Sequence, residues 1–461
     1  MSDRRPLIII LAAGKGTRMK SAEPKVLHAI AGRSLIGHVM AAAAEAGADH
    51  IAVVVGPGMD AVAAEVRRQH PAASLHVQQT QLGTADAVRA AGGAIAGHAG
   101  DVIVLFGDTP LMAADTIRAV ATKLNAGSDI VVVGFEAPDP AGYGRLLTDA
   151  SGKLEAIREH KDASEAERRV RLCNSGVMGF RGEHLGDLLD AIGNTNAKGE
   201  YYLTDTVAIG RAKGLKAGVV MGTADEVLGV NDRGQLAAAE AIFQARKRRE
   251  VMAEGATLIA PETVYFSFDT SVGRDVVIEP YVVIGPGVTI ADRVSVRAFS
   301  HITGTDRKSQ QGTQIGEGAE IGPYARLRPG AAIGKNVHIG NFVEVKNVTL
   351  EEGAKANHLT YLGDGRVGRG ANIGAGTIFC NYDGFNKHFT DVGAEAFIGS
   401  NAALVAPVKI GDGAFVGSGS VITRNVAPGA LALERSVQEE RPGWAAKFRQ
   451  LMGRKKKAKS A

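Results

Sequence analysis

The chain has 461 residues, only two of them cysteines, and a formal net charge of +4 at neutral pH. This length exceeds what one ordinary hydrophobic core accommodates, so two or more domains are expected. Two cysteines cannot form a disulfide framework, and they favour a reducing, cytoplasmic setting. No apolar run approaches the roughly 18 residues of a membrane span, and the start, Met1 to Gly16, lacks a signal-peptide cleavage pattern.

A glycine-rich, basic loop follows the first apolar segment. Residues 7–10 form a β-branched run typical of a buried parallel strand, and the loop runs from Leu11 to Met19 before a Pro24-Lys25 pair. Such a strand end is a place to bind phosphates. The glycine spacing fits neither the P-loop nor the dinucleotide fingerprint, which has a third glycine where Met19 stands. A solvated glycine-rich turn is the alternative that the local pattern leaves open.

Strand-like and helical segments then alternate along the first half of the chain. Apolar runs at 51–55, 102–106 and 130–135 are predicted strands, and 61–69 and 116–124 are predicted helices. This alternation predicts an α/β, Rossmann-like domain with a mostly parallel sheet and helices on both faces. Ligands of such sheets bind at the carboxyl ends of the strands.

Polar residues fall at those strand ends. Gly107-Asp108 follows the strand 102–106 directly, where a carboxylate is well placed to hold Mg²⁺ on phosphates. A turn led by Asp108 explains the same residues equally well. Further polar groups, each weak by itself, stand at Gln78, 81–84, 143–145, 159–161, 174–176 and 230–233.

The order of these signals resembles the sugar-1-phosphate nucleotidylyltransferase family, whose opening signature L-A-A-G-x-G-T-R-M and P-K pair are intact from Leu11 to Lys25. The resemblance covers residues 5 to 232 and is greatest to uridylyltransferases that use UTP and N-acetylglucosamine 1-phosphate. It implies that the uridine is held by Leu11, Ala12, Ala13, Gly14, Gln78, Gly83 and Thr84. It implies that Lys25 and Arg18 act on the triphosphate, that Asp108 and Asn231 bind Mg²⁺, and that the sugar is held by Gly144, Glu159 and Asn174.

One long helix is predicted between residues 234 and 254, ending near Gly255. Its basic run 246–249 is more typical of a solvated or subunit-facing helix than of a nucleic-acid site. Because this segment separates two different periodicities, it is predicted to be the linker between domains.

Beyond it, aliphatic residues recur at every sixth position in three runs: Val272, Ile278, Ile284, Ile290, Val296, Ile302; Ile315, Ile321, Leu327, Ile333, Ile339, Val345; and Val392, Ile398, Leu404, Ile410, Val416, Ile422. Neither a helix nor a hairpin sheet has a six-residue period. Hexapeptide repeats are typical of a parallel β-helix, in which each inward aliphatic residue stacks on the next coil. Two breaks, 304–314 and 380–388, are predicted loops.

The hexads resemble the left-handed β-helix acyltransferases, which assemble as trimers. The motifs around His358, Asn372 and Cys380 are similar to those of glucosamine-1-phosphate N-acetyltransferases, so both halves resemble one bifunctional enzyme family of UDP-N-acetylglucosamine synthesis. The resemblance implies that His358 is the general base as acetyl-CoA acetylates glucosamine 1-phosphate, with Glu344 a candidate to orient it. It implies acceptor contacts from Arg328, Lys346, Tyr361, Asn372 and Lys387, and acetyl-CoA contacts from Ala375, Asn381, Tyr382, Ser400, Ser418 and Arg435.

The predicted organisation is a uridylyltransferase domain at 1–232, a linker helix at 233–254, a β-helix acetyltransferase domain at 255–440 and a basic tail at 441–461. The tail holds the only tryptophan, Trp444, and is predicted to be a short helix or loop packed on the coil, then disordered.

Two other functions are compatible with the same two folds: a nucleotidylyltransferase for another sugar 1-phosphate with a regulatory β-helix, and a non-catalytic exchange-factor-like subunit. The presence of His358 speaks against the first, and the presence of Lys25 and Asp108 speaks against the second.

Overall fold

The computed structural model describes residues 5–150, 152–305 and 309–459. The chain divides into two compact units. The N-terminal unit comprises residues 1–250 with 265–268, and the C-terminal unit comprises 251–264 with 269–461. The insertion predicted at 304–314 includes residues 306–308, which lie outside the described part.

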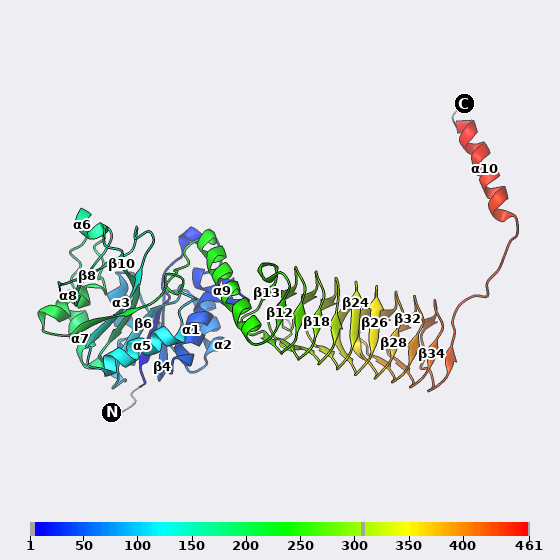
Figure 1. Ribbon diagram of the computed structural model, residues 1–461, viewed down its shortest axis with the longest axis horizontal. Helices are drawn as coiled ribbons and strands as arrows, with labels where there is room; N and C mark the ends of the chain where they lie inside the picture. Colours follow the sequence, from blue (N-terminus) through cyan, green and yellow to red (C-terminus); the bar gives the residue numbers. More distant parts are fainter. Residues whose placement is uncertain (1–4, 151, 306–308, 460–461) are drawn as a thin grey trace. The chain divides into compact units, whose positions relative to one another are not determined.

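A mostly parallel sheet forms the centre of the N-terminal unit (Figure 1), in the order β11-β7-β10-β6-β1-β4-β5. Strand β1 pairs in parallel with β4 and β6, whereas β10 runs antiparallel to β6 and β7. Strands β8 and β9 form a hairpin beside β10. The strands are β1 (Leu7–Leu11), β4 (His50–Val55), β5 (Ser74–Val77), β6 (Val102–Phe106), β7 (Ile130–Glu136), β8 (Arg145–Thr148), β9 (Leu154–Arg158), β10 (Leu172–Phe180) and β11 (Ala217–Met221), with a separate short hairpin β2 (Ala29–Ile30) and β3 (Arg33–Ser34).

Helices cover both faces of this sheet, because alternate residues of β1 point to opposite sides. Ile8 and Ile10 pack in one buried cluster with residues of α1, α2 and α5, and Leu7 and Ile9 pack in another with residues of α3, α7 and α8. The helices are α1 (Leu35–Glu45), α2 (Asp60–Gln69), α3 (Thr84–Ala90), α4 (Gly92–Ala96), α5 (Ala114–Asn125), α6 (Glu165–Arg168), α7 (Gly182–Asp190) and α8 (Asp205–Ala212). The predicted α/β sheet with two covered faces is therefore confirmed.

The predicted long helix is α9 (Arg233–Ala253). Its Ala239 is buried in a small apolar cluster with Ile30 and Leu35. Arg246, in the basic run, donates a hydrogen bond from Nη1 to the Leu111 carbonyl at 2.9 Å. Part of the run thus packs on the N-terminal unit.

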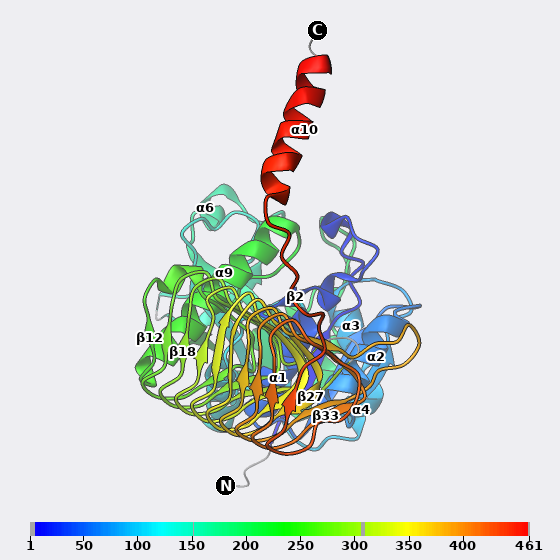
Figure 2. The same cartoon turned by 90° about the vertical axis from the view of Figure 1, so that its right-hand side faces the viewer.

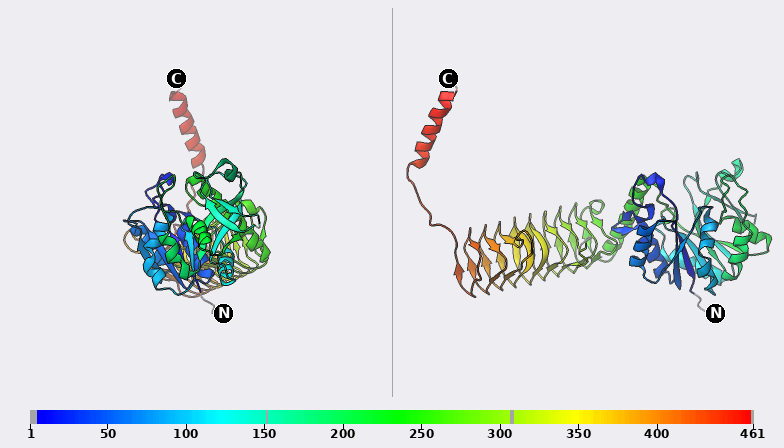
Figure 3. Two further views of the ribbon diagram at one scale, coloured as in Figure 1. Left: turned by 90° about the vertical axis from the view of Figure 1, so that its left-hand side faces the viewer. Right: turned by 180° about the vertical axis from the view of Figure 1, so that it is seen from behind.

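The C-terminal unit is a parallel β-helix of short strands, whose evenly spaced rungs are visible from two sides (Figures 1 and 3). One sheet follows the order β12-β15-β18-β21-β24-β26-β28-β31-β34-β36. Its strands are β12 (Thr257–Leu258), β15 (Val277–Ile278), β18 (Ser295–Val296), β21 (Glu320–Ile321), β24 (His338–Asn341), β26 (Lys355–His358), β28 (Asn372–Ile373), β31 (Phe397–Ile398), β34 (Phe415–Val416) and β36 (Leu431–Ala432).

The remaining coil strands pair in parallel with the equivalent strands of the next coil. They are β14 (Ser271–Val272), β16 (Val283–Ile284), β17 (Val288–Ile290), β19 (His301–Ile302), β20 (Thr313–Ile315), β22 (Arg326–Leu327), β23 (Ala331–Ile333), β25 (Glu344–Leu350), β27 (Tyr361–Val367), β29 (Ile378–Cys380), β30 (Thr390–Val392), β32 (Ala403–Val405), β33 (Val408–Ile410) and β35 (Val421–Ile422). Strand β13 (Tyr265–Phe266) belongs to the N-terminal unit.

Every aliphatic residue of the three predicted hexad runs is buried, which confirms the six-residue pattern. Partners in neighbouring coils are usually 18 residues apart, as Ile278 and Val296 are. The register lengthens between Ile290 and Ile315, across the first predicted break. It shortens between Ile339 and Ala356, just before His358. The second break, 380–388, leaves the stacked coils as a mostly exposed loop (Figure 2).

Four aromatic side chains form a row at one corner of the coils. Tyr281, Phe299, Tyr324 and Phe342 each have a positive φ, between 57° and 61°. Their rings stack with centroids 5.0, 4.9 and 5.3 Å apart, and about half of each side chain is exposed. We call this set the aromatic row.

The tail contains a helix, α10 (Trp444–Lys459). Trp444 stacks on Phe448 with centroids 5.0 Å apart, and 56% of Trp444 is exposed. Residues 433–456 are exposed throughout, so the predicted packing of this segment on the coil is wrong. Within the described part of the chain, no helix is both long and apolar enough to cross a membrane.

Candidate active sites

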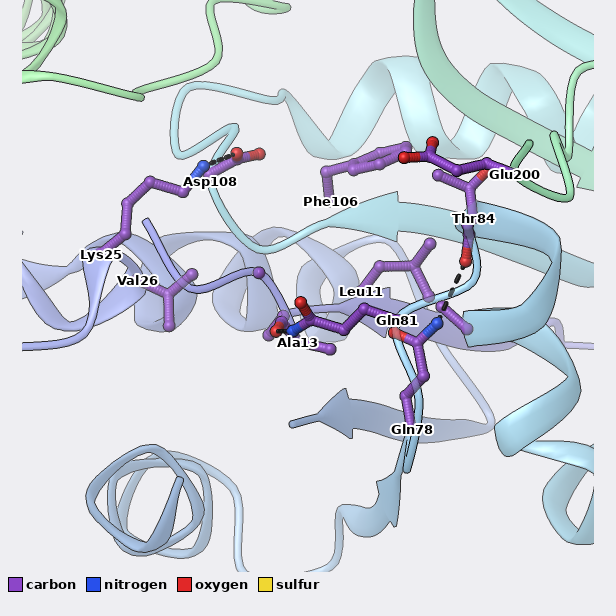
Figure 4. Close-up of a pocket in the computed structure, with 14 residues that line it drawn as sticks. Leu11, Ala13, Lys25, Val26, Gln78, Gln81, Thr84, Phe106, Asp108 and Glu200 are labelled. Atoms are coloured by element: carbon purple, nitrogen blue, oxygen red, sulfur yellow. Dashed lines mark hydrogen bonds and ion pairs between the residues drawn. The ribbon is translucent and has the colours of Figure 1, made fainter. Parts of the chain in front are cut away.

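A pocket of about 260 Å³ opens at the carboxyl ends of β1 and β6 (Figure 4). Its lining includes nine of the residues predicted to hold nucleotide or metal: Leu11, Ala12, Ala13, Gly14, Lys25, Gln78, Gly83, Thr84 and Asp108. Gln78 and Gln81 form hydrogen bonds with neighbouring residues of the lining. Gln78 donates to the Gly83 carbonyl at 3.1 Å and to Asp86 at 2.8 Å, and Gln81 donates to the Ala13 carbonyl.

The Lys25 side chain forms hydrogen bonds with two side-chain oxygens from distant parts of the chain. Its ammonium donates to the Asp108 carboxylate and, at 2.9 Å, to the Asn231 amide oxygen. Asp108 follows β6 and Asn231 precedes α9, so the fold brings together side chains that are far apart in sequence. Only 11% of the Lys25 side chain and 21% of Asp108 is exposed. The two oxygens thus converge on one position that a cation occupies.

Gly83 shapes the pocket because no side chain fits at its place. Its φ is +123°, and a Cβ atom there would lie 2.5 Å from the Tyr201 carbonyl oxygen. Gly16 has a comparable role, since a Cβ atom would lie 2.4 Å from Cβ of Lys25. Gly16 therefore permits the close approach of Lys25, and Gly83 permits that of the segment near Tyr201.

The three predicted sugar residues lie together, outside the pocket lining. The Asn174 N–H donates to the Gly144 carbonyl at 2.8 Å, and a Cβ atom on Gly144 would lie 3.4 Å from the Glu159 carboxylate. Thr204 donates a hydrogen bond to Glu159 at 3.3 Å. Burial raises the pKa of Glu159. Arg18 is exposed on a short 3₁₀ helix, Thr17–Met19, and does not line the pocket.

In the C-terminal unit, His358 lies at the end of β26 beside a hollow of about 430 Å³. Its Nδ1 lies 2.8 Å from the amide oxygen of Asn341, the residue that pairs with it in the preceding coil. Because that oxygen only accepts hydrogen bonds, Nδ1 is the donor, and in the neutral imidazole the lone pair then lies on Nε2. Glu344, the candidate to orient His358, accepts a hydrogen bond from Arg328 at 2.8 Å, and its action on His358 stays a prediction.

The predicted acetyl-CoA residues continue in line from His358. His358, Ala375, Ser400 and Ser418 each stand two residues after an inward residue, and those inward residues pair from coil to coil. The Arg435 guanidinium donates to the Ser418 carbonyl at 3.0 Å. The Tyr382 hydroxyl donates to the Gly384 carbonyl in the exposed loop.

Four of the five residues predicted to bind the acetyl acceptor lie near one of two carboxylates. Arg328 pairs with Glu344, while Lys346 and Lys387 lie 3.5 and 3.7 Å from the carboxylate of Asp364. Tyr361 pairs with Glu344 in the strand register. Asn372 stands apart from these, on β28 of the other sheet, in register with Lys355.

Several contacts were not predicted from the sequence. Glu200 and Phe106 line the nucleotide pocket, Asn341 bonds to His358, and Asp364 joins the acceptor lysines. Asn341 could have been found, because it lies one coil before His358. Glu200 follows no strand and carries no motif, so nothing in the pattern pointed to it. Among the described residues, no group of three or more His, Cys, Asp or Glu side chains forms a metal site.

Sequence comparisons define the class of each unit. The profile of the MobA-like NTP transferase domain matches residues 8–172, and that of the bacterial transferase hexapeptide (six repeats) matches 269–304, 312–347 and 389–424. The chain thus joins a nucleotidyltransferase domain to a hexapeptide-repeat transferase domain, which is a left-handed β-helix as predicted.

Full-length relatives identify the family. The bifunctional protein GlmU of Bradyrhizobium sp. (strain ORS 278) is 58% identical over 449 residues, covering 97% of this chain and 98% of the relative. The namesakes from Rhodopseudomonas palustris (strain CGA009) and Paramagnetospirillum magneticum are 55% and 51% identical, each over the full length of both chains. The chain belongs to the family of bifunctional GlmU proteins. The predicted function is therefore confirmed: the protein is a bifunctional uridylyltransferase and acetyltransferase of UDP-N-acetylglucosamine synthesis.

Proposed function

We propose that the pocket around Lys25 transfers uridylyl groups and that the coils around His358 transfer acetyl groups, with acetylation first. The observation that carries the proposal is the convergence of Asp108 and Asn231 on the Lys25 ammonium. The proposed domains keep the predicted bounds, 1–232, 233–254, 255–440 and 441–461.

In uridylyl transfer, the phosphate of N-acetylglucosamine 1-phosphate attacks the α-phosphorus of UTP and expels pyrophosphate. Both reactants are anions, so the protein must neutralise and align them. Lys25 lines the pocket and Arg18 lies in the glycine-rich loop, and each supplies positive charge to the triphosphate. Gly144, Glu159 and Asn174 bind the sugar, and the lining residues from Leu11 to Gly14 with Gln78, Gly83 and Thr84 bind the uridine.

Mg²⁺ fits the oxygen atoms of Asp108 and Asn231. Both are hard oxygen donors, and Mg²⁺ is typically held by one or two such side chains together with substrate phosphates. The Lys25 ammonium already marks a position between them at which a cation is stable. When bound there, Mg²⁺ would supply positive charge to the phosphate oxygens. Lys25 would then pair with phosphate instead of with Asp108.

In acetyl transfer, the amine of glucosamine 1-phosphate attacks the thioester of acetyl-CoA. His358 Nε2 accepts the proton of the amine, because Nδ1 is occupied by Asn341. The backbone N–H of Ala375 stabilises the oxyanion. Arg328, Lys346, Tyr361, Asn372 and Lys387 bind the acceptor. Acetyl-CoA is bound along Ala375, Asn381, Tyr382, Ser400, Ser418 and Arg435.

The proposed assembly is a homotrimer through the β-helix. The aromatic row supports it, because a contiguous row of half-exposed rings is typical of a surface that another chain covers. Tyr324 and Phe342 of this row also line the hollow beside His358. The proposed location is the cytoplasm, where UTP and acetyl-CoA are supplied, and both cysteines are free thiols as such a location favours.

The test is an assay with glucosamine 1-phosphate, acetyl-CoA, UTP and Mg²⁺ in which free CoA and pyrophosphate are measured separately. CoA release should need no UTP. Pyrophosphate release from glucosamine 1-phosphate should need acetyl-CoA, because the uridylyl site prefers the acetylated sugar. Pyrophosphate release without acetyl-CoA at an equal rate would reverse the proposed order.

A further inference from the structure

A buried carboxylate outside the predicted set lies among the acceptor residues. Asp364 stands on β27 with a φ of 51°, a left-handed conformation that Asp adopts more readily than most residues. Only 8% of the residue is exposed. A carboxylate this buried needs several partners to be stable.

Four side chains supply those partners, from two neighbouring segments. From β25, Asn347 donates its amide to Oδ1 at 2.8 Å and the Lys346 ammonium lies 3.5 Å from the same oxygen. From the loop after β29, Asn381 donates its amide to Oδ2 and the Lys387 ammonium lies 3.7 Å away. Asp364 therefore ties the loop 380–388 to the coil that carries Lys346.

The charges of this cluster do not cancel. Two ammonium groups face one carboxylate, so a net positive charge is left for an anion. Lys346 and Lys387 also repel each other. The neighbouring Lys387, together with burial, lowers the pKa of Lys346, and Asp364 acts in the opposite direction. Burial by itself would raise the pKa of Asp364, but the Asn347 hydrogen bond and the Lys346 charge hold it below its ordinary value.

We propose that Asp364 is a positioning residue for acetyl transfer: its carboxylate holds Lys346 and Lys387 together, protonated and side by side, to receive the phosphate of the acceptor sugar. This inference rests on the proposed acetyltransferase site. The lysine side chains remain accessible, with 22% of Lys346 and 51% of Lys387 exposed, whereas only 11% of the Asp364 side chain is exposed. Asp364 thus acts through the lysines, and its hydrogen bond to Asn381 links them to an acetyl-CoA residue.

The test is the Asp364→Asn variant of the full-length enzyme, assayed for CoA release at varied glucosamine 1-phosphate and pH. The KM for the acceptor should rise about 10- to 100-fold, the range expected when charge-assisted contacts are lost, with a smaller change in kcat. Without the carboxylate, the pKa of Lys346 falls further. The loss of acceptor affinity at alkaline pH should therefore begin at a lower pH than in the unaltered enzyme.

The matched control is Asp391→Asn, which removes a coil carboxylate that pairs with Arg366 at 2.7 Å and is not placed in either site. It should leave the acceptor KM and its pH profile unchanged. An Asp364→Asn enzyme with unchanged KM and pH profile overturns this inference alone. Absence of acetyl transfer by the unaltered enzyme overturns the proposed site and this inference with it. Should Asp364→Asn not fold, Asp364→Glu keeps the charge but displaces it, and an unchanged KM there overturns the inference.

Discussion

The two units assemble their chemistry in opposite ways. In the N-terminal unit, the central contact joins Lys25, Asp108 and Asn231, which come from three separate segments of the chain. In the C-terminal unit, His358, Ala375, Ser400 and Ser418 occupy one position of successive coils. The α/β sheet collects residues that are distant in sequence, whereas the β-helix places one residue of each successive coil in line.

This difference affects how each site tolerates change. In a repeat structure each coil contacts mainly its neighbours, so a substitution in one coil acts locally. In the α/β unit, loss of the Lys25 side chain removes a hydrogen-bond donor from two other segments, those of Asp108 and Asn231. We therefore expect single substitutions to separate the two activities.

The largest effect is expected from Asp108→Ala. Removing the carboxylate takes from Lys25 one of its two acceptors, leaving the Asn231 amide oxygen, and removes a ligand of the proposed Mg²⁺ site. Uridylyl transfer, measured as pyrophosphate release, should fall by about 10³-fold or more. Acetyl transfer should not change. The control is Asp115→Ala, an exposed carboxylate on α5. Near-normal uridylyl transfer in Asp108→Ala would contradict the assignment.

His358→Ala should lower acetyl transfer by about 10²- to 10⁴-fold, the usual contribution of a general base. Uridylyl transfer should continue, because the substitution lies at the surface of one coil. His338→Ala is the matched control, since His338 is a surface histidine on β24 that pairs only weakly with Glu320 at 3.8 Å. A parallel loss of both activities in His358→Ala would instead indicate misfolding.

Gly83→Ala tests the close packing of the nucleotide pocket. The added Cβ meets the Tyr201 backbone and the positive φ is strained, so the free energy of unfolding should fall by about 1–3 kcal/mol. The KM for UTP should rise while acetyl transfer is kept. Gly92→Ala serves as control, because its Cβ meets no atom within 4 Å and its φ is not positive. Equal unfolding free energies for the two variants would contradict the prediction, because they would mean that the Tyr201 backbone moves aside for the added methyl group.

The smallest effect is expected from pH acting on Glu159. Burial raises the pKa of this carboxyl, so a falling pH protonates it sooner than an ordinary glutamate. In the proposed sugar site its ionised form would accept hydrogen bonds from sugar hydroxyls, so the KM for N-acetylglucosamine 1-phosphate should rise as pH falls through the raised pKa. The free energy of unfolding changes in the opposite direction. The fold favours the neutral carboxyl of Glu159, so this stabilisation is lost as pH rises through the raised pKa. Glu159→Gln should remove this pH dependence, and an identical profile in that variant would rule out Glu159 as its source.

Much of the fold could be predicted because its signals are local. The hexad positions are buried as expected, and β6 spans the residues 102–106 of the predicted strand. The nucleotide residues were predicted through resemblance to a family, since no spacing rule relates Lys25 to Asn231. The partners of those residues were largely missed. Asp364 is a polar residue within β27, and only the stacking of coils shows that its carboxylate lies near two lysines.

The tail was predicted least well because its exposed residues carry no tertiary constraint. Trp444 begins a helix and stacks on Phe448, and neither residue is buried. A basic composition cannot distinguish such a helix from a disordered end.

The position of that tryptophan has a practical consequence for optical measurements. Trp444 is the only tryptophan in the chain, and it lies in the tail and not in either folded core. Its fluorescence should therefore hardly respond when the sheet or the coils unfold, and it should report instead on whatever covers the tail. The protein carries a natural probe for that segment, whereas the unfolding of its two catalytic units must be followed through tyrosine or circular dichroism.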